Sequence, residues 1–492
     1  MRVSKINEVH LKVETEPSIA RELADYFTFE VPGHRFMPAY KNKIWDGKIR
    51  LFSTATGKIY VGLLEYLKKF CDRNDIQINI DEGVEDVKKI TREVVEGFIK
   101  SLKPMARGNP IKLRDYQIDA VEYGIKSNRA LLVSPTASGK SLIIYSLVRY
   151  YKMMGLKTLI LVPTTSLVEQ MYSDFKDYGW NSDNHCQKIY QGHDKNVSKD
   201  VVISTWQSIY KFPKKYFEQF GMVVGDEAHL FKSKSLTTIM TKLHLCRFRF
   251  GLTGTLDGLQ CHQLMLEGMF GSVERTVRTS ELQKDGYLSD LKINILLCRH
   301  DTIFFEDYQE EINKIIENRR RNKIICKLSL DIANNTLILF NFVEKHGEPL
   351  WELLNSINKL KHTDTQKQLF FIHGGVAAEE REKVRELCEH NSNAIILASY
   401  GTFSTGINIK NLHNIIFASP MKSRVRNLQS IGRALRTHDS KAQATLYDFA
   451  DDFSNEHYRN ITLNHLKERI KIYKQERFNY SITEIKLGDT NG

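Results

Sequence analysis

The sequence contains no long apolar stretch. Its longest apolar runs, such as TLILF at residues 336–340, are far shorter than the roughly 20 residues with which a helix spans a bilayer. The first residues, MRVSKINEVHLKVETEPS, include no apolar segment of the kind found in secretory signals. We therefore expect neither export nor membrane insertion, and we expect an intracellular, cytoplasmic protein.

Cysteine is scarce and scattered. The seven cysteines are odd in number and no two form a CxxC pair, so the sequence predicts neither a disulfide framework nor a zinc site. They are Cys71, Cys186, Cys246, Cys261, Cys298, Cys326 and Cys388. We expect them to be reduced residues of the core.

The chain also has no low-complexity segment and no short-period repeat. Its 492 residues suggest about three domains, and 41% hydrophobic with 26% charged residues is typical of a globular protein. The formal charge of +12 and the pI near 9.1 favour a polyanionic partner, because cationic side chains release counterions from nucleic acid. The charge alone also fits a protein of the membrane surface.

Alternating strand and helix patterns predict the fold. Residues 1–105 carry no nucleotide-type motif and lead into a basic, turn-rich stretch, KPMARGNPIKLR. Beyond it, short apolar strands such as RALLVS, TLILVP and VVIST alternate with helical patterns, and the alternation resumes after KDGYLSDLKINI. The sequence predicts an α/β protein with a small N-terminal α/β module (1–105) and two parallel-sheet units in tandem (106–283 and 284–492). The chain is expected to finish with an amphipathic helix, LNHLKERIKIYKQERF, and a short polar tail.

The segment SPTASGKS, residues 134–141, ends like a phosphate-binding loop. It follows the strand pattern RALLV and opens the helical pattern SLIIYSLV, so its backbone N–H groups and the positive helix end would face a phosphate. Gly139, Lys140 and Ser141 supply the open backbone, the lysine for the outer phosphates and the hydroxyl for Mg²⁺. Ser134 stands where the usual motif has a glycine, and short GKS sequences arise by chance, so the loop alone leaves the question open.

The segment GDEAH, residues 225–229, supplies the second half of a nucleotide site. Asp226 comes at the carboxyl end of a predicted strand, where ligands of α/β sheets bind, and it can hold Mg²⁺. Glu227 can orient and deprotonate an attacking water. The alternative is a solvated turn of two adjacent acids, but finding both halves on successive strands of one sheet favours the nucleotide site.

The segment QSIGRALR, residues 429–436, places Arg433 and Arg436 one helical turn apart, so both can lie on one helix face. Guanidinium groups suit the charge that develops on a transferring phosphoryl group, although two lone arginines would equally suit a basic surface helix. The preceding SYGTFSTGINIKNL favours the first interpretation, because Ser404, Thr405 and Gly406 offer hydroxyls and open backbone to a phosphate.

Taken in order, these segments resemble the motifs of superfamily 2 helicases. The series is LRDYQ, SPTASGKS, VPTTSLVEQ, ISTWQS, GDEAH, GLTGTL, ILFNFVEKH, FIHGG, SYGTFSTGINIKNL and QSIGRALR, and it spans roughly residues 112–450. This superfamily often has a small residue at the place of Ser134. The N-terminal segment FTFEVPGHRFMPAYKNKIWDGKIRLF is similar to that of the UvsW family of phage recombination helicases, and XPB-type repair translocases resemble the chain more distantly.

The resemblance implies two RecA-like motor domains that use ATP and Mg²⁺. It implies that Gln117 reads the adenine, that Ser141 and Asp226 hold the metal, and that the loop binds the phosphates. The implied loop residues are Pro135, Thr136, Ala137, Ser138, Gly139, Lys140 and Ser141. The implied catalytic set is Lys140, Asp226, Glu227, Gln429, Arg433 and Arg436, and the set that couples the nucleotide to the nucleic acid is His229, Thr253 and Thr255.

The resemblance also implies the nucleic-acid contacts of the motor domains. These are Pro163, Thr164, Thr165, Thr205, Trp206, His373, Gly374, Ser404 and Thr405. Many relatives have Asp at the position of Asn408, so a ribose contact there is not implied.

Residues 34–58 mix cations with aromatic residues. Arg35, Lys43, Trp45 and Lys48 are expected to contact DNA, because cations meet phosphates and aromatic rings stack on bases. The alternative is that the aromatic residues form the core of the module and the lysines its ordinary surface. The run NRRRNK, residues 318–323, lies in a helical pattern and is expected to be a solvated face.

Together these features predict an ATP-dependent DNA helicase or translocase. The resemblance implies work on branched DNA, including fork regression, Holliday-junction branch migration and R-loop unwinding, in recombination and repair. We expect a monomer that binds single-stranded, double-stranded and branched DNA, and RNA in RNA–DNA hybrids, in the host cytoplasm if the chain is phage-encoded. Two alternatives stay open: a DEAH-type RNA helicase, and a DNA-annealing or binding module with ATP as a switch. A restriction-type motor is less favoured, because the first hundred residues hold no convincing nuclease carboxylate cluster.

Overall fold

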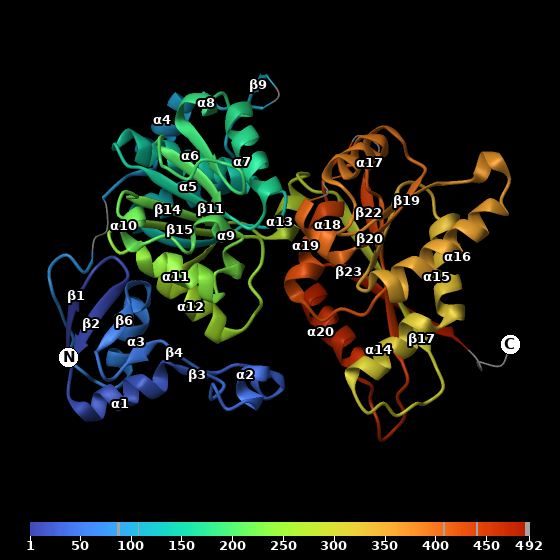
Figure 1. The fold of residues 1–492 in the computed structure, drawn as a ribbon, viewed down its shortest axis with the longest axis horizontal. Coiled ribbons are helices and arrows are strands. Elements are labelled where there is room, and N and C mark those ends of the chain that lie inside the picture. The colour runs from blue at the N-terminus through green and yellow to red at the C-terminus, as the bar shows by residue number, and fades with distance from the viewer. Residues whose placement is uncertain (86–88, 107, 407–408, 439–440, 488–492) are drawn as a thin grey trace. The chain divides into compact units, whose positions relative to one another are not determined.

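The computed structural model describes residues 1–85, 89–106, 108–406, 409–438 and 441–487. The chain forms two compact units (Figure 1). The first comprises residues 1–134 and 139–277, and the second comprises residues 135–138 and 278 onward. Each unit is described below by itself.

A five-stranded sheet opens the first unit. Its order is β5-β6-β2-β1-β7, and its pairs are antiparallel except for β1 with β7. The strands are β1 (Arg2–Lys5), β2 (His10–Glu14), β5 (Phe52–Ser53), β6 (Lys58–Tyr60) and β7 (Asn79–Ile80). Helices α1 (Pro17–Tyr26) and α3 (Leu64–Arg73) bury Leu23, Leu67 and Phe70 in a core shared with Val3 and Leu11 of the sheet.

Residues 28–50 leave this sheet and form what we call the arm. Strands β3 (Thr28–Glu30) and β4 (Lys48–Arg50) make a two-stranded antiparallel sheet of their own. Between them lie a 3-10 turn (His34–Phe36) and the short helix α2 (Pro38–Lys41). Figure 1 shows the arm projecting from the five-stranded sheet, with α2 at its far end.

The N-terminal sheet is docked on the larger sheet of the same unit. The Glu8 carboxylate pairs with Arg129 at 2.6 Å, and the N–H of Glu8 donates to the carbonyl of His244 at 3.0 Å. Leu264 of α12 (Gln260–Phe270) belongs to the same apolar core as the N-terminal strands. A Cβ on Gly62 would lie 1.9 Å from the carbonyl oxygen of Glu267, so this approach requires glycine.

A seven-stranded parallel sheet forms the rest of the first unit. Its order is β12-β13-β11-β14-β15-β10-β16. The strands are β10 (Arg129–Val133), β11 (Thr158–Val162), β12 (Cys186–Ile189), β13 (Val201–Thr205), β14 (Met222–Asp226), β15 (Phe248–Thr253) and β16 (Val273–Arg275). Short strands rich in Val, Ile and Leu and buried on both faces are typical of a parallel sheet covered by helices.

Helices cover both faces of this sheet. One apolar core lies under α4 to α7 and the other under α11 and α12. The helices are α4 (Arg92–Leu102), α5 (Asp115–Ser127), α6 (Lys140–Met153), α7 (Thr165–Asp177), α8 (Ser182–His185), α9 (Trp206–Ile209), α10 (Lys214–Phe217), α11 (Lys234–Lys242) and α12. A small pair of strands, β8 (Met105–Ala106) and β9 (Asn109–Pro110), precedes α5.

Strands β10 and β14 are not neighbours in this sheet. Strand β15 lies between them and pairs in parallel with both. The expectation that the phosphate loop and the acid pair follow successive strands was therefore wrong. They flank a third strand, which carries the LTGT segment.

A second seven-stranded parallel sheet dominates the second unit. Its order is β19-β20-β18-β21-β22-β17-β23. The strands are β17 (Asp290–Arg299), β18 (Thr336–Phe340), β19 (Gln368–Ile372), β20 (Ala394–Ser399), β21 (Asn414–Phe417), β22 (Gln443–Asp452) and β23 (Asn479–Lys486). The expected polar tail was wrong for residues 479–486, which add β23 to the sheet beside β17.

The helices of the second unit lie on both faces of its sheet. Helices α15 and α16 share one apolar core with the strands, and Figure 1 shows α18, α19 and α20 across the sheet from them. The helices are α13 (Thr279–Lys284), α14 (Tyr308–Glu317), α15 (Arg319–Asp331), α16 (Glu348–Lys359), α17 (Ala378–His390), α18 (Tyr400–Gly406), α19 (Arg424–Ala434) and α20 (Ile461–Gln475).

The run NRRRNK is not a solvated face throughout. Arg319 and Arg320 are exposed at the start of α15, but Arg321 and Asn322 are buried. The expectation was wrong for these two residues, because Arg321 pairs with Asp451 of β22 and the side-chain amide of Asn322 donates to the carbonyl of Ile316.

The predicted fold class is confirmed: two RecA-like parallel-sheet domains in tandem follow a small N-terminal α/β region. All seven cysteines are buried and none is in a disulfide. Within the described residues, no helix has the length and apolar character needed to cross a membrane.

Candidate nucleotide and nucleic-acid site

The loop that follows β10 is bonded to the sheet at its first residue. The N–H of Ser134 donates to the carbonyl of Thr253 at 2.9 Å, and the Ser134 hydroxyl accepts from Thr276 at 3.0 Å. Ser134 is completely buried, which explains why a small side chain stands there. Ala137 and Gly139 have φ of 66° and 80°, and α6 begins directly after Gly139. The loop therefore turns its backbone sharply before the helix N-terminus, the geometry that suits a phosphate.

Gln117 lies against this loop. A Cβ on Gly139 would fall 2.4 Å from Nε2 of Gln117, so glycine is required at this position. The other side-chain atom, Oε1, accepts from the N–H of Arg114 at 2.9 Å and helps to fix the start of α5. The structure thus brings the predicted adenine-reading residue and the phosphate loop together.

Lys140 and Ser141 are the first two residues of α6. The Lys140 ammonium donates to the carbonyl of Ser134 at 3.3 Å, across the mouth of the loop. The Ser141 side chain is half-buried beside it. Both side chains therefore stand at the helix end where an anion is stabilised.

The acid pair lies at the carboxyl end of β14. Asp226 is the last residue of the strand and is buried, and burial followed by the charge of Glu227 raises its pKa to about 7, while Lys140 opposes the shift. Glu227 has φ of 51°, unusual for a residue other than glycine, and its N–H donates to Oδ1 of Asp226 at 3.0 Å. Two adjacent carboxylates offer the oxygen ligands that Mg²⁺ prefers, so Asp226 and Glu227 fit that metal.

His229 joins the acid pair to the neighbouring strand. Its Nδ1 lies 3.0 Å from the hydroxyl of Thr253 and 3.3 Å from Oε2 of Glu227. The Thr253 hydroxyl also donates to the carbonyl of Thr255 at 3.1 Å. The three residues predicted to couple the two sites are thus in direct contact with one another.

The predicted nucleic-acid residues of the first unit gather at one edge of the sheet. Pro163, Thr164 and Thr165 follow β11, and Thr205 ends β13, which is its neighbour. The two segments are linked, because Gln207 donates to the carbonyl of Pro163 at 3.4 Å. The Thr164 hydroxyl accepts from the N–H of Leu167 at 3.3 Å and caps α7, while Trp206 packs partly into the core.

The corresponding residues of the second unit also follow neighbouring strands. His373 and Gly374 come after β19, and α18, with the backbone of Ser404 and Thr405, comes after β20. His373 Nδ1 accepts from the N–H of Gly375 at 3.2 Å. Asn408 lies outside the described residues.

Gln429 and Arg433 lie on α19, but Arg436 does not. The helix ends at Ala434, and Arg436 instead forms an isolated antiparallel bridge with Leu288. The expectation that both arginines share one helical turn was wrong in this respect, because the chain leaves the helix between them. The guanidinium of Arg433 lies 5.3 Å from the ring centre of Phe403.

The arm presents a different set of residues than predicted. Arg35 and Lys43 are exposed, but Trp45 and Lys48 are half-buried, and the indole N–H of Trp45 donates to the carbonyl of Lys48 at 2.8 Å. Phe36 is 81% exposed. Phe36, which the sequence did not separate from the other aromatic residues, therefore offers the more open ring. Ile44, 79% exposed, is a second apolar side chain of the arm, and no sequence signal marked it.

Three comparisons with known proteins agree with this geometry. Residues 3–81 match the family described as "DNA helicase UvsW, N-terminal", residues 110–258 match "Type III restriction enzyme, res subunit", and residues 319–438 match "Helicase conserved C-terminal domain". The chain is 36% identical over 501 residues to the ATP-dependent DNA helicase uvsW of Enterobacteria phage T4, covering 97% of this chain and 98% of that protein.

More distant likeness extends to repair translocases. The DNA 3'-5' translocase XPB2 of Sulfurisphaera tokodaii is 26% identical over 390 residues, covering 71% of this chain and 84% of that protein. Among solved structures, the crystal structure of T4 UvsW matches with a TM-score of 0.53 at 34% identity and covers 99% of both chains.

Proposed function

This chain belongs to the UvsW family of ATP-dependent DNA helicases, and from that membership we propose that it remodels branched DNA in recombination and repair. The proposed reactions are fork regression, Holliday-junction branch migration and R-loop unwinding. The observation that carries the nucleotide part of the proposal is the contact of Thr253 with both the phosphate loop and His229, because it joins the loop to the acid pair at one edge of the sheet.

We assign the nucleotide chemistry to residues of both motor domains. Gln117 reads the adenine and the loop from Pro135 to Ser141 binds the phosphates. Ser141 and Asp226 would hold Mg²⁺, which when bound offsets the charge of the phosphates. Glu227 takes the proton of the attacking water.

The second motor domain contributes Gln429, Arg433 and Arg436 to the same nucleotide. Guanidinium groups stabilise the negative charge that grows on the transferred phosphoryl group. The backbone of Arg433 is held within α19, and that of Arg436 is held by its bridge to Leu288 beyond the end of the helix. We keep the predicted division into a module (1–105) and two motor domains (106–283 and 284–492).

The DNA strand is proposed to run past the strand-end segments of both motor domains. In each domain two such segments follow neighbouring strands, β11 and β13 in the first and β19 and β20 in the second. Contacts from threonine hydroxyls and backbone reach phosphates and carry no base information, so we expect little sequence preference. Cycles of ATP hydrolysis then move the grip along one strand.

The arm is proposed to contact the branch. Arg35 and Lys43 are placed to meet phosphates, and the exposed ring of Phe36 can stack on an unpaired base. We further propose that the protein acts as a monomer in the cytoplasm, that of an infected host if the chain is phage-encoded, and accepts RNA within RNA–DNA hybrids.

Steady-state ATP hydrolysis at fixed low salt tests this function. The rate is compared without nucleic acid and with single-stranded DNA, a four-way DNA junction or structured RNA. We expect the strongest stimulation from branched DNA. If only RNA stimulates hydrolysis, the substrate is RNA and not DNA. DNA binding without turnover would favour an annealing module in which ATP is a switch.

A further inference from the structure

Four of the six residues between β21 and α19, Ala418–Met421, are held by hydrogen bonds from several directions. The carbonyl of Ala418 accepts from Arg321 at 2.7 Å, and the carbonyl of Met421 accepts from Arg469 at 3.1 Å. We call residues 418–421 the α19 leader. Both ends of the leader are therefore bonded to a buried guanidinium group.

The middle of the leader is bonded as well. The hydroxyl of Ser419 accepts from the N–H of Asn341 at 3.1 Å and lies 2.9 Å from Nδ1 of the buried His346. The side-chain amide of Asn341 donates to the carbonyl of Pro420 at 3.4 Å. All four residues of the leader thus have a polar contact with residues that lie at least 48 positions away in the chain.

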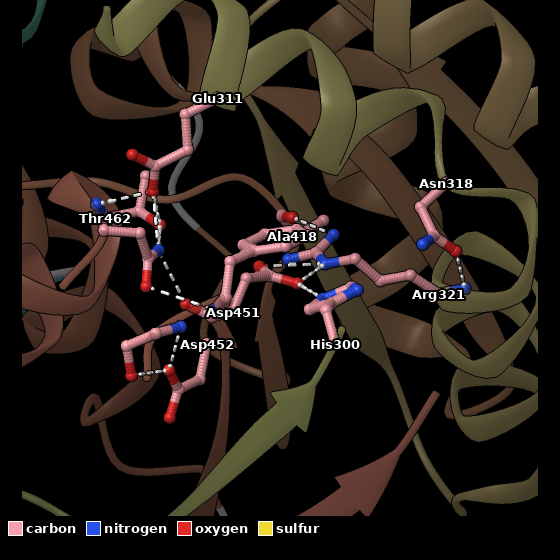
Figure 2. Close-up of polar contacts among 11 residues, drawn as sticks. His300, Glu311, Asn318, Arg321, Ala418, Asp451, Asp452 and Thr462 are labelled. Carbon is pink, nitrogen blue, oxygen red and sulfur yellow. Dashed lines mark hydrogen bonds and ion pairs between the residues drawn. The ribbon is translucent and has the colours of Figure 1, made fainter. Parts of the chain in front are cut away.

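The two arginines reach the leader from opposite faces of the sheet. Arg321 comes from α15 and its Nε donates to both carboxylate oxygens of Asp451, at 2.8 and 3.0 Å (Figure 2). Arg469 comes from α20 and its Nε donates to Asp448 at 2.8 Å. Asp448 and Asp451 both lie on β22, and their spacing of three residues puts them on opposite faces of the strand. Figure 2 shows the Arg321 guanidinium lying between Asp451 and Ala418.

Stability alone does not account for these two ion pairs. All four side chains are buried, and replacing a buried ion pair by apolar residues of similar volume is often neutral or stabilising. Nη2 of Arg321 and Oδ1 of Asp448 are buried without a hydrogen-bond partner among the described residues. Each arginine bonds a carboxylate and a backbone carbonyl at once, which an apolar pair could not do.

What the leader controls is the start of α19. The helix begins at Arg424, three residues after Met421, and its N-cap Ser423 accepts from the N–H of Arg426 at 3.4 Å. A fixed leader therefore fixes the position and direction of the helix that carries Gln429 and Arg433. A displacement near 1 Å in such a group can lower a rate by about 100-fold.

We propose that Arg321 and Arg469 are positioning residues for α19, and that with Asp451 and Asp448 they clamp its leader from both faces of the sheet. Neither arginine is assigned a contact with nucleotide or DNA. The proposal rests on the proposed function, since it presumes that Gln429 and Arg433 act on the nucleotide.

Substitution by lysine is the direct test. Arg321→Lys and Arg469→Lys keep a positive charge for the aspartate but lose the planar fork that bonds carboxylate and carbonyl together. We expect kcat for DNA-stimulated ATP hydrolysis to fall about 10- to 100-fold. We expect the KM for ATP, the Kd for single-stranded DNA and the melting temperature to stay close to those of the unaltered protein.

Arg299→Lys is the matched control. Arg299 also pairs with an aspartate of β22, Asp452, and with Glu484 at 2.6 Å, but among the described residues it makes no hydrogen bond to the leader. Its kcat should be unchanged. If a lysine variant does not fold, the apolar pair Arg321→Met/Asp451→Leu replaces it, because it leaves no buried charge behind.

Two results with the Arg321 and Arg469 variants would overturn the proposal. One is an unchanged kcat in a folded lysine or apolar-pair variant. The other is a parallel decline of kcat, ATP affinity and melting temperature, which would mean that the pairs only support the fold. Arg433→Ala in the same assay distinguishes failure of the clamp proposal from failure of the proposed function of α19. If Arg433→Ala is inactive while the Arg321 and Arg469 variants are normal, only the clamp proposal is wrong. If Arg433→Ala hydrolyses ATP normally, the assignment of α19 to the nucleotide fails and the clamp proposal falls with it.

Discussion

The N–H of Ser134 donates to the carbonyl of Thr253 at 2.9 Å, so the first residue of the phosphate loop is bonded to the end of the neighbouring strand β15. The same threonine contacts His229 through its hydroxyl. A shift of the loop is therefore transmitted to β15 directly through a backbone hydrogen bond, with no side chain in between. This short connection underlies the first three predictions.

Lys140→Ala should abolish ATP turnover and leave DNA binding intact. The lysine is the cation nearest the carbonyl of Ser134 at the mouth of the loop, and its loss removes the positive charge that the outer phosphates need. We expect kcat to fall at least about 100-fold, in the range seen when one transition-state donor is removed. A coupled ATPase assay and a fluorescence-anisotropy titration with single-stranded DNA measure the two effects. Normal turnover would exclude this loop as the phosphate-binding site.

Glu227→Gln should bind ATP but hydrolyse it about 100- to 10,000-fold more slowly, because the amide cannot accept a proton from water. The substitution is nearly isosteric, so the left-handed turn after β14 is preserved. ATP-bound complexes on DNA should then persist, which filter binding with labelled nucleotide can detect. Hydrolysis at the original rate would exclude Glu227 as the general base.

His229→Ala should separate hydrolysis from its stimulation by DNA. The substitution breaks the connection from Glu227 to Thr253 while leaving both residues in place. We expect ATP hydrolysis without DNA to change by less than about threefold and the stimulation by DNA to fall about 10-fold, a typical coupling free energy. His262→Ala is the control, because His262 pairs with Asp257 at 2.6 Å outside this network. Equal losses with and without DNA would mean that His229 only supports the acid pair.

Phe36→Ala should weaken binding to a four-way junction by about 10-fold, the value of one base–aromatic stack of 1–3 kcal/mol. ATP hydrolysis on single-stranded DNA should stay unchanged. Leu245→Ala, at another exposed apolar side chain of the same unit, is the control. Deleting residues 1–105 would be a poorer test, because it would uncover Arg129 and Leu264. A loss of both junction binding and single-strand hydrolysis in Phe36→Ala would contradict a branch-specific role.

His346 should make stability fall in mild acid. Burial and then the charge of Arg321 lower its pKa from 6.5 to about 3, so the folded protein keeps the imidazole neutral while the unfolded chain takes up a proton. The sign follows: nothing is lost above pH 6.5, and the free energy of unfolding declines by about 1 kcal/mol between pH 6.5 and 5.5. Urea denaturation at these two pH values measures the decline. His346→Asn should reduce it by that amount, and an equal decline in the variant would place the titration elsewhere.

Local motifs were predictable from the sequence because their residues are close together in the chain. The phosphate loop, the acid pair and the LTGT segment each follow a short apolar strand, and parallel strands bring their carboxyl ends to one edge. That β15 lies between the other two strands was not predictable, since strand order is a property of the whole sheet. The site roles themselves stay predictions.

Specific contacts, two of them between distant residues and one local, account for what the sequence missed. Arg321 is buried because Asp451, 130 residues later, supplies its counter-charge, and a run of three arginines by itself indicates solvent. Trp45 turns its indole N–H onto Lys48, which composition cannot distinguish from an open stacking surface. Arg436 leaves α19 because the chain there pairs with Leu288.

The separation in sequence between Arg321 and Asp451 also determines when this ion pair can form during synthesis of the chain. At roughly 5–20 residues per second, the ribosome adds β22 on the order of ten seconds after α15 has been made. During that interval the guanidinium has no aspartate to pair with, and it stays in water because burying an unpaired charge is costly. This side of α15 can therefore reach its native buried contacts only after β22 has been made.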